Sequence, residues 1–140
     1  MTKQQKYKIL EDLTSDIAFK AYGKTKQELL ENSGEALLSI MADIDTIKPK
    51  KTVLVKVEGE DYNDLLFNWL QELIAVIEIE GIYFSSFSVK EFSKTSCIVE
   101  CKGEPIQQKM EKAHIKAITR YLYSVKETKQ GLTATVTVDV

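Results

Sequence analysis

Carboxylates near the two ends of the chain are the groups best suited to bind an ion. Asp12 and Asp16 lie close together near the start, and Asp139 is followed by Val140, which we expect to add a terminal carboxylate. If strands bring these segments together, their oxygen atoms match the ligands that Ca²⁺ and Mg²⁺ prefer. Acidic side chains are also common at strand ends and on solvated surfaces. The residues alone therefore leave two interpretations open, a cation site and an ordinary acidic surface.

Other familiar catalytic patterns are not found in the sequence. It contains no nucleophile elbow, no phosphate-binding glycine loop and no His-Glu-x-x-His motif. The only histidine, His114, is expected at the surface or in a turn. Cys97 and Cys101 are expected on one strand, about 13 Å apart, which is too far for a disulfide. We interpret them as two small buried hydrophobic residues.

Length and charge exclude several classes of protein. The 140 residues predict a single domain spanning 1–140. A formal charge of −2 is too small to draw the chain to nucleic acid by bulk electrostatics, so no strong direct binding is expected. The densest basic run, 48–51, is expected in a solvated loop. The polar start and the lack of a run of about 18 apolar residues predict no signal peptide and no membrane span. We therefore expect a cytoplasmic protein.

The elements that would position these residues begin with a strand and a helix. Alternating apolar side chains predict a strand over 16–22. Thr25 and Glu28 then have the spacing of a capping box, in which each side chain bonds the other residue's backbone N–H. A helix is predicted from Lys26 to about Met41, because apolar residues recur on one side at helical spacing: Leu29, Leu30, Leu37, Ile40 and Met41.

A second strand and a second helix follow. Alternating valines predict a strand over 51–59, and either Asp61 or Asn63 is expected to cap the next helix. Gly81 is a plausible end for that helix. Its broad apolar stripe predicts the main core helix: Leu65, Leu66, Trp69, Leu70, Leu73, Ile74 and Ile77. We expect Trp69 to be buried within this stripe rather than exposed as an anchor for a partner.

After Gly81 the helical period gives way to β-branched and aromatic residues. Four further strands are predicted, over 82–92, 95–102, 115–126 and 132–140. The last has the clearest alternation, with its apolar residues on one face and threonines and Asp139 on the other. The predicted fold class is α/β, with two helices packed on one face of a mixed β-sheet in a two-layer sandwich.

Short segments in this order resemble the archease family over nearly the whole chain. The segment Thr14-Ser15-Asp16-Ile17 resembles the family's entry motif. The segment Ala21-Tyr22-Gly23-Lys24-Thr25 resembles the aromatic-glycine turn that follows that motif. The family's Trp-Leu-Asn-Glu-Leu helix resembles residues 69–73, and its glycine-aromatic-serine strand resembles residues 81–85. Residues 115–119 resemble its Val-Lys-Ala-Val-Thr segment, and residues 138–140 resemble its Leu-Asp-Ile end.

The resemblance implies an accessory protein that activates a tRNA-splicing RNA ligase by promoting its guanylylation and multiple turnover. It implies no catalysis by the protein itself. It also implies a divalent cation, commonly calcium, held by Asp16, Asp139 and the main-chain oxygen of Val140. Our charge argument adds Asp12 as a candidate metal ligand. Thr14, Lys116 and Thr119 are expected to line the site or to contact the partner.

Three positions depart from the family pattern. Leu13 stands where histidine is usual, Tyr121 stands near a position often held by histidine, and Asn68 stands where aspartate commonly precedes the tryptophan. These changes leave open a divergent member that serves as a chaperone-like binding module. A small metal-dependent hydrolase is a weaker alternative, because general acid–base catalysis needs a suitably placed proton-transfer group. Stimulation of the ligase would separate the activator from both alternatives.

Overall fold

The computed structural model describes residues 5–11 and 17–140. Its helices and short 3-10 turns are α1 (Lys26–Met41), η1 (Ile44–Thr46), α2 (Tyr62–Glu80) and η2 (Gln108–Met110). Its strands are β1 (Tyr7–Glu11), β2 (Ile17–Gly23), β3 (Lys51–Glu58), β4 (Ile82–Ser93), β5 (Ser96–Pro105), β6 (Ala117–Thr128) and β7 (Gly131–Asp139). No helix in these ranges is long and apolar enough to cross a membrane.

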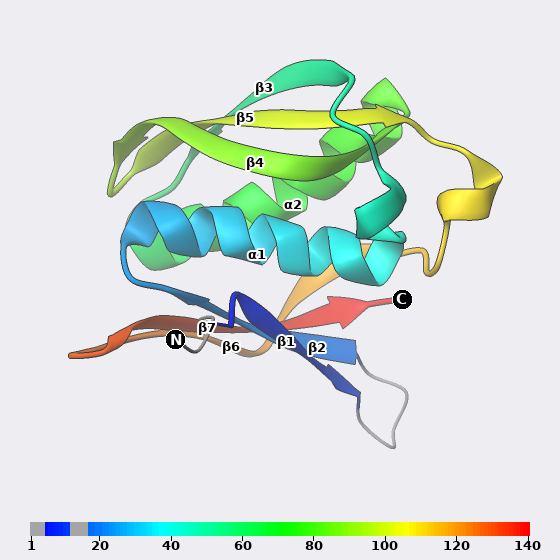
Figure 1. Cartoon of the computed structure of the whole chain (residues 1–140). Coiled ribbons are helices and arrows are strands. Elements are labelled where there is room, and N and C mark those ends of the chain that lie inside the picture. Colours follow the sequence, from blue (N-terminus) through cyan, green and yellow to red (C-terminus); the bar gives the residue numbers. More distant parts are fainter. Residues whose placement is uncertain (1–4, 12–16) are drawn as a thin grey trace.

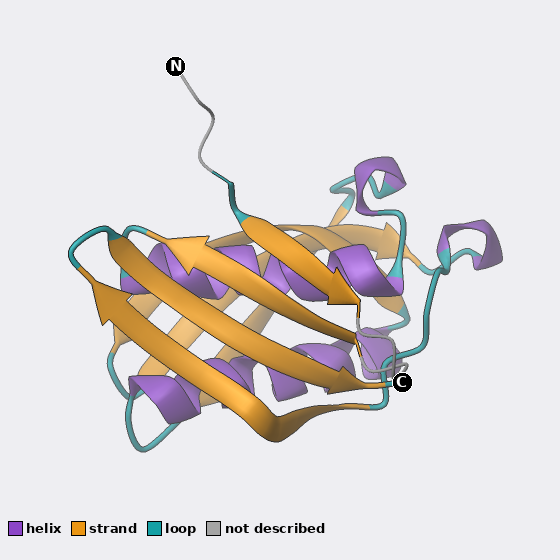
Figure 2. Ribbon diagram, turned by 90° about the horizontal axis from the view of Figure 1, so that it is seen from below, coloured by secondary structure: helices purple, strands orange, loops and turns teal. Residues whose placement is uncertain are grey.

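The strands form two sheets that enclose the two helices (Figure 1). One sheet has the order β1-β2-β7-β6 and covers the helices in Figure 2, and the other has the order β3-β5-β4. Helix α1 contacts β2 and β4, which belong to different sheets, and α2 contacts β6 and β3 in the same way. Both helices therefore bury apolar side chains on two sides.

The predicted α/β class and both predicted helices are confirmed, but the arrangement of the layers differs. In place of one mixed sheet with helices on one face, the described strands pair only antiparallel and lie on both sides of the helices. Tight turns join β4 to β5 and β6 to β7. Such short connections permit only antiparallel neighbours, because a parallel crossover needs a dozen or more residues.

Local signals explain why the helices begin and end where they do. Thr25 Oγ1 accepts the backbone N–H of Glu28 at 3.1 Å, as predicted. The return bond differs, because Glu28 reaches the N–H of Lys24 at 3.2 Å rather than that of Thr25. Asp61 caps α2 by accepting the N–H of Asp64 at 2.8 Å. Gly81 ends α2 with φ of 65°, a left-handed conformation that glycine adopts without strain.

Trp69 lies at the centre of the core, which confirms its predicted burial. Its side chain is 0% exposed, and its indole N–H donates to the carbonyl of Leu30 on α1 at 2.9 Å. The ring also meets Phe87 of β4 edge to face, with the centroids 5.9 Å apart. A Cβ at Gly34 would lie 3.1 Å from the Trp69 ring. Trp69 therefore joins both helices to the three-stranded sheet.

Cys97 and Cys101 are free, buried residues of β5, as the sequence predicts. Burial raises the pKa of the Cys97 thiol to about 11 and that of Cys101 to about 12. Both thiols are therefore protonated near neutral pH and pack as apolar groups. His114 has an exposed side chain, 3.6 Å from the carboxylate of Glu78, which agrees with its predicted surface position.

Candidate functional site

The end of β7 brings together segments from both ends of the chain. Asp139, the last residue of β7, pairs with Ala117 at the start of β6. On the other side of β7, Val138 pairs with Ile17, the first residue of β2. The N–H of Lys116 donates to the main-chain oxygen of Asp139 at 2.7 Å. Antiparallel pairing therefore places the ends of three strand segments at one edge of the sheet (Figure 2).

The predicted site residues in the described part of the chain lie at or near this edge. The side chains of Asp139 and Lys116 are exposed, and Val140 is 44% exposed. Thr119 is half-buried and pairs with Thr137, farther along β6, and its Oγ1 accepts the N–H of Tyr121 at 3.0 Å. The other predicted residues, Asp12, Thr14 and Asp16, lie outside the described residues, as does the departure at Leu13.

The chemistry of the described donors fits a hard cation only in part. Asp139 offers a carboxylate, and Val140 offers a main-chain oxygen on an exposed residue. Both are oxygen donors, which Ca²⁺ and Mg²⁺ prefer, but Ca²⁺ takes six to eight ligands. Residues 5–11 and 17–140 contain no cluster of three or more acidic, histidine or cysteine side chains suited to a metal. The predicted cation therefore stays a prediction that also depends on Asp12 and Asp16.

Two departures from the family pattern have different structural settings. Asn68 donates its side-chain amide to the carbonyl of Glu58 at 3.0 Å, and this bond ties α2 to the end of β3. An ionised aspartate at this position could not donate that hydrogen bond. Tyr121, by contrast, is 65% exposed on β6. The change at position 68 therefore has a role in the fold, whereas position 121 faces solvent.

One residue that supports this edge was not identified from the sequence. The side-chain amide of Gln71 on α2 accepts the N–H of Ile118 at 3.1 Å and donates to the carbonyl of the same residue at 3.4 Å. Gln71 thus pairs with the backbone of β6 as a neighbouring strand would. It fixes β6 one residue beyond Ala117, which pairs with Asp139. Helical spacing alone marks Gln71 only as a polar residue beside the buried stripe.

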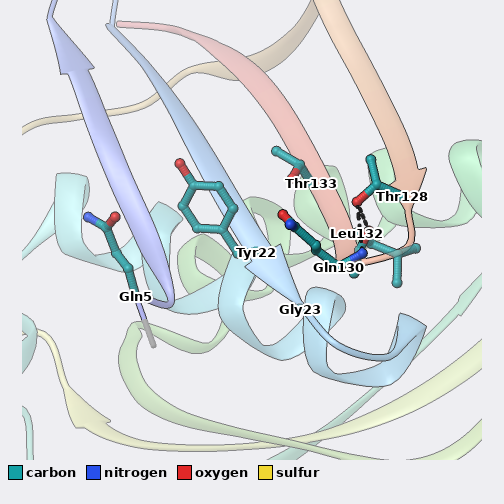
Figure 3. A pocket seen from close by; sticks show the side chains of 8 residues that line it. Gln5, Tyr22, Gly23, Thr128, Gln130, Leu132 and Thr133 are labelled. Carbon is teal, nitrogen blue, oxygen red and sulfur yellow. Dashed lines mark hydrogen bonds between the residues drawn. The ribbon is translucent and has the colours of Figure 1, made fainter. Parts of the chain in front are cut away.

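A pocket of about 320 Å³ lies at the opposite end of the same sheet (Figure 3). It is formed where the turn between β6 and β7 meets the end of β2, and uncharged residues line it, including Gln5, Tyr22 and Thr128. The hydroxyl of Thr128 donates to the carbonyl of Gly131 at 3.2 Å and closes the turn. Because β7 runs from this turn to Asp139, the pocket is separate from the carboxylate edge.

The fold and this edge define a small α/β protein that exposes carboxylate oxygens where three strand segments meet. A model of the Archease protein family (MTH1598/TM1083) matches residues 7–140, and this chain belongs to that family. Protein archease of Methanopyrus kandleri is 32% identical, and the alignment covers 91% of this chain and 94% of that protein. The Methanosarcina barkeri protein is also 32% identical, with all of both chains covered.

Two solved structures have the same fold. The solution structure of Methanobacterium thermoautotrophicum protein 1598 has a TM-score of 0.84 and 29% identity, and the match covers 96% of this chain and 99% of that one. A crystal structure from Thermotoga maritima, described as an archease and possible chaperone, has a TM-score of 0.67 at 23% identity, with 100% and 98% covered. The second likeness concerns the fold alone. The resemblance found in the sequence is thus confirmed at the level of the family.

Proposed function

We propose that this protein assists a tRNA-splicing RNA ligase in the cytoplasm during tRNA processing. It promotes guanylylation of the ligase and repeated turnover, and it does not itself catalyse the joining of RNA. The observation that carries the proposal is family membership over residues 7–140.

A divalent cation, calcium in the first instance, belongs to this proposal. Its ligands would be the carboxylates of Asp16 and Asp139 and the main-chain oxygen of Val140, with Asp12 as an additional candidate. When bound, the ion would neutralise carboxylates that otherwise repel one another. The support is that Ile17, the residue after Asp16, pairs with Val138, the residue before Asp139. Lys116 then fixes the backbone of Asp139 through its N–H.

The test of the function is a ligation assay with the ligase from the same organism. Guanylylation and the number of turnovers are measured with and without this protein, at equal ligase concentration. We expect the protein to increase both quantities and to join no RNA on its own. If an active ligase shows no stimulation, the activator proposal is wrong, and the chaperone-like binding module becomes the better account of the fold.

Calcium is expected to stabilise the protein, and Asp139→Asn is expected to remove most of this stabilisation by calcium. Ligand binding to the folded state alone adds roughly 2.7 kcal/mol when the free ion is about 100 times its dissociation constant. Asparagine keeps the size of the side chain and the main-chain bond to Lys116 while removing the charge. The measurement is the shift in melting temperature on adding Ca²⁺ or Mg²⁺.

Asp45→Asn is the matched control, because Asp45 is an exposed acidic residue of η1, outside the proposed ligands. This variant should keep the full calcium response. Asp16→Asn tests the ligand that lies outside the described residues, and it should lose the response as Asp139→Asn does. A wild-type melting temperature that neither ion changes would contradict the cation proposal while leaving the ligation assay to decide the function.

A further inference from the structure

Strand β6 is the outermost strand of the four-stranded sheet, and it contains a bulge. Thr119 pairs with Thr137 and Ser124 pairs with Thr135, so residues 120–123 lie opposite a single residue of β7. Within the bulge, Leu122 has φ of 58°, and it is the only non-glycine residue with positive φ in the described ranges. A bulky residue rarely adopts this conformation unless its surroundings impose it.

The two ends of the bulge are held against α2, which explains how the conformation is maintained. The guanidinium of Arg120 stacks 3.7 Å from the centre of the Phe67 ring, and its Nη2 lies 3.3 Å from a carboxylate oxygen of Asp64. The hydroxyl of Tyr123 donates to the carbonyl of Asn63 at 2.6 Å. Both flanking side chains therefore contact the first turns of the helix.

The two residues between these anchors project into solvent. Tyr121 is 65% exposed and Leu122 is 67% exposed. We call this pair the Tyr121–Leu122 protrusion. Because the backbone is already held by its flanks, little further ordering is needed when the side chains are buried by a partner. Tyrosine is also among the residues that contribute most to protein interfaces.

A simpler interpretation is that the bulge only prevents pairing of the sheet edge with another chain. Lysine, other charged residues and proline protect edges too, and Arg120, Lys126 and Glu127 are exposed on this strand. The tip of the bulge instead carries tyrosine and leucine, and Leu122 itself has the unfavourable backbone conformation. Edge protection does not account for either of these features.

We propose that the Tyr121–Leu122 protrusion inserts into an apolar pocket of the protein partner, and that this partner is the RNA ligase of the proposed function, on which the inference rests. Tyr121 and Leu122 lie four and five residues along β6 from Ala117, which pairs with Asp139. At about 3.3 Å per residue, their Cα atoms are at most roughly 17 Å from that of Ala117. A partner of ordinary size that covers the Asp139 edge therefore reaches both features, since a standard interface spans about 800 Å² per partner.

A protein partner fits the protrusion better than RNA does. Stacking on bases needs a flat π surface, which Tyr121 has and Leu122 lacks. The adjacent residue, Arg120, is already paired with Asp64. The N–H of Glu60 and the guanidinium of Arg120 together hold the pKa of Asp64 below its usual range, so this pair stays charged and compensated. Leu122 instead favours an apolar pocket.

The test measures the dissociation constant of the purified ligase for three variants and the wild type, by calorimetry. Leu122→Asn removes the apolar side chain and introduces a residue that tolerates positive φ, so its melting temperature should equal or exceed that of the wild type. Tyr121→Ser removes the aromatic ring at a position with ordinary φ. We expect each to weaken ligase binding roughly tenfold or more.

Leu54→Asn is the matched control, because Leu54 is 64% exposed on β3 of the other sheet. Its dissociation constant should equal that of the wild type. Wild-type affinity in both Tyr121→Ser and Leu122→Asn would overturn the protrusion proposal and leave the proposed function intact. A wild-type protein that neither binds nor stimulates the ligase would overturn both.

A single-stranded RNA oligonucleotide serves as the second probe. If Tyr121→Ser loses binding to this RNA but keeps wild-type affinity for the ligase, the protrusion is an RNA contact and the proposal is wrong. Should Leu122→Asn fail to melt cooperatively, Tyr121→Ser alone decides the result, because its substitution changes no unusual backbone conformation.

Discussion

Removal of residues 132–140 is expected to prevent folding altogether. These residues form nearly all of β7, which lies between β2 and β6 and pairs with both. Four of its apolar side chains are at most 6% exposed: Leu132, Ala134, Val136 and Val138. Burial of each larger one contributes roughly 1.5–3 kcal/mol. Removing β7 loses this burial and two ladders of hydrogen bonds. The lost free energy is comparable to the whole stability of a domain, about 5–15 kcal/mol.

Circular dichroism and thermal melting measure this result. The truncated protein should lack a cooperative transition, whereas a chain lacking only Val140 should melt as the full chain does in a buffer without divalent ions. Val140 follows the end of β7 and is 44% exposed, so its removal leaves the sheet intact. A native spectrum with cooperative melting in the truncated chain would show that β7 is dispensable.

Trp69→Ala is expected to lower the free energy of unfolding by roughly 3–5 kcal/mol, the usual cost of deleting a large buried aromatic side chain. The substitution leaves a cavity where α1, α2 and β4 meet. It also removes the donor to the Leu30 carbonyl and the edge contact with Phe87. Urea unfolding followed by circular dichroism measures the change.

Leu54→Ala provides the comparison for this second prediction, because its side chain is 64% exposed. Surface substitutions of this kind usually change stability by less than about 0.5 kcal/mol. A Trp69→Ala protein as stable as Leu54→Ala would mean that the indole contributes little to the core, in spite of its complete burial.

The helices could be predicted from the sequence because their signals are local. The bounds of α1 agree with the predicted 26–41, since an N-cap and an apolar stripe lie within that segment. The same holds for α2 between Asp61 and Gly81. The division of the strands into two sheets depends on contacts between distant segments, so no local pattern encodes it. Strand β1 was missed, because its segment continues a polar start.

The surroundings of the candidate site could be predicted only in part. Resemblance to the family implied Asp139 and Lys116 as candidates, but the support from Gln71 depends on a bond between residues 47 positions apart. The bulge in β6 was also invisible, because Tyr121-Leu122-Tyr123 is as β-prone as the residues around it. Its conformation depends on Phe67 and Asn63 of α2, which bind its flanks only after the helix has packed.

The position of β7 between β2 and β6 also determines the order in which the protein can assemble on the ribosome. Strands β3, β4 and β5 are consecutive in the sequence apart from α2, so their sheet can form once Pro105 has emerged from the ribosome. Strand β2 is made early, yet its inner neighbour β7 is made last. At typical rates of synthesis, about 5–20 residues per second, β2 waits several seconds for that neighbour. During this interval its apolar face depends on α1 for cover.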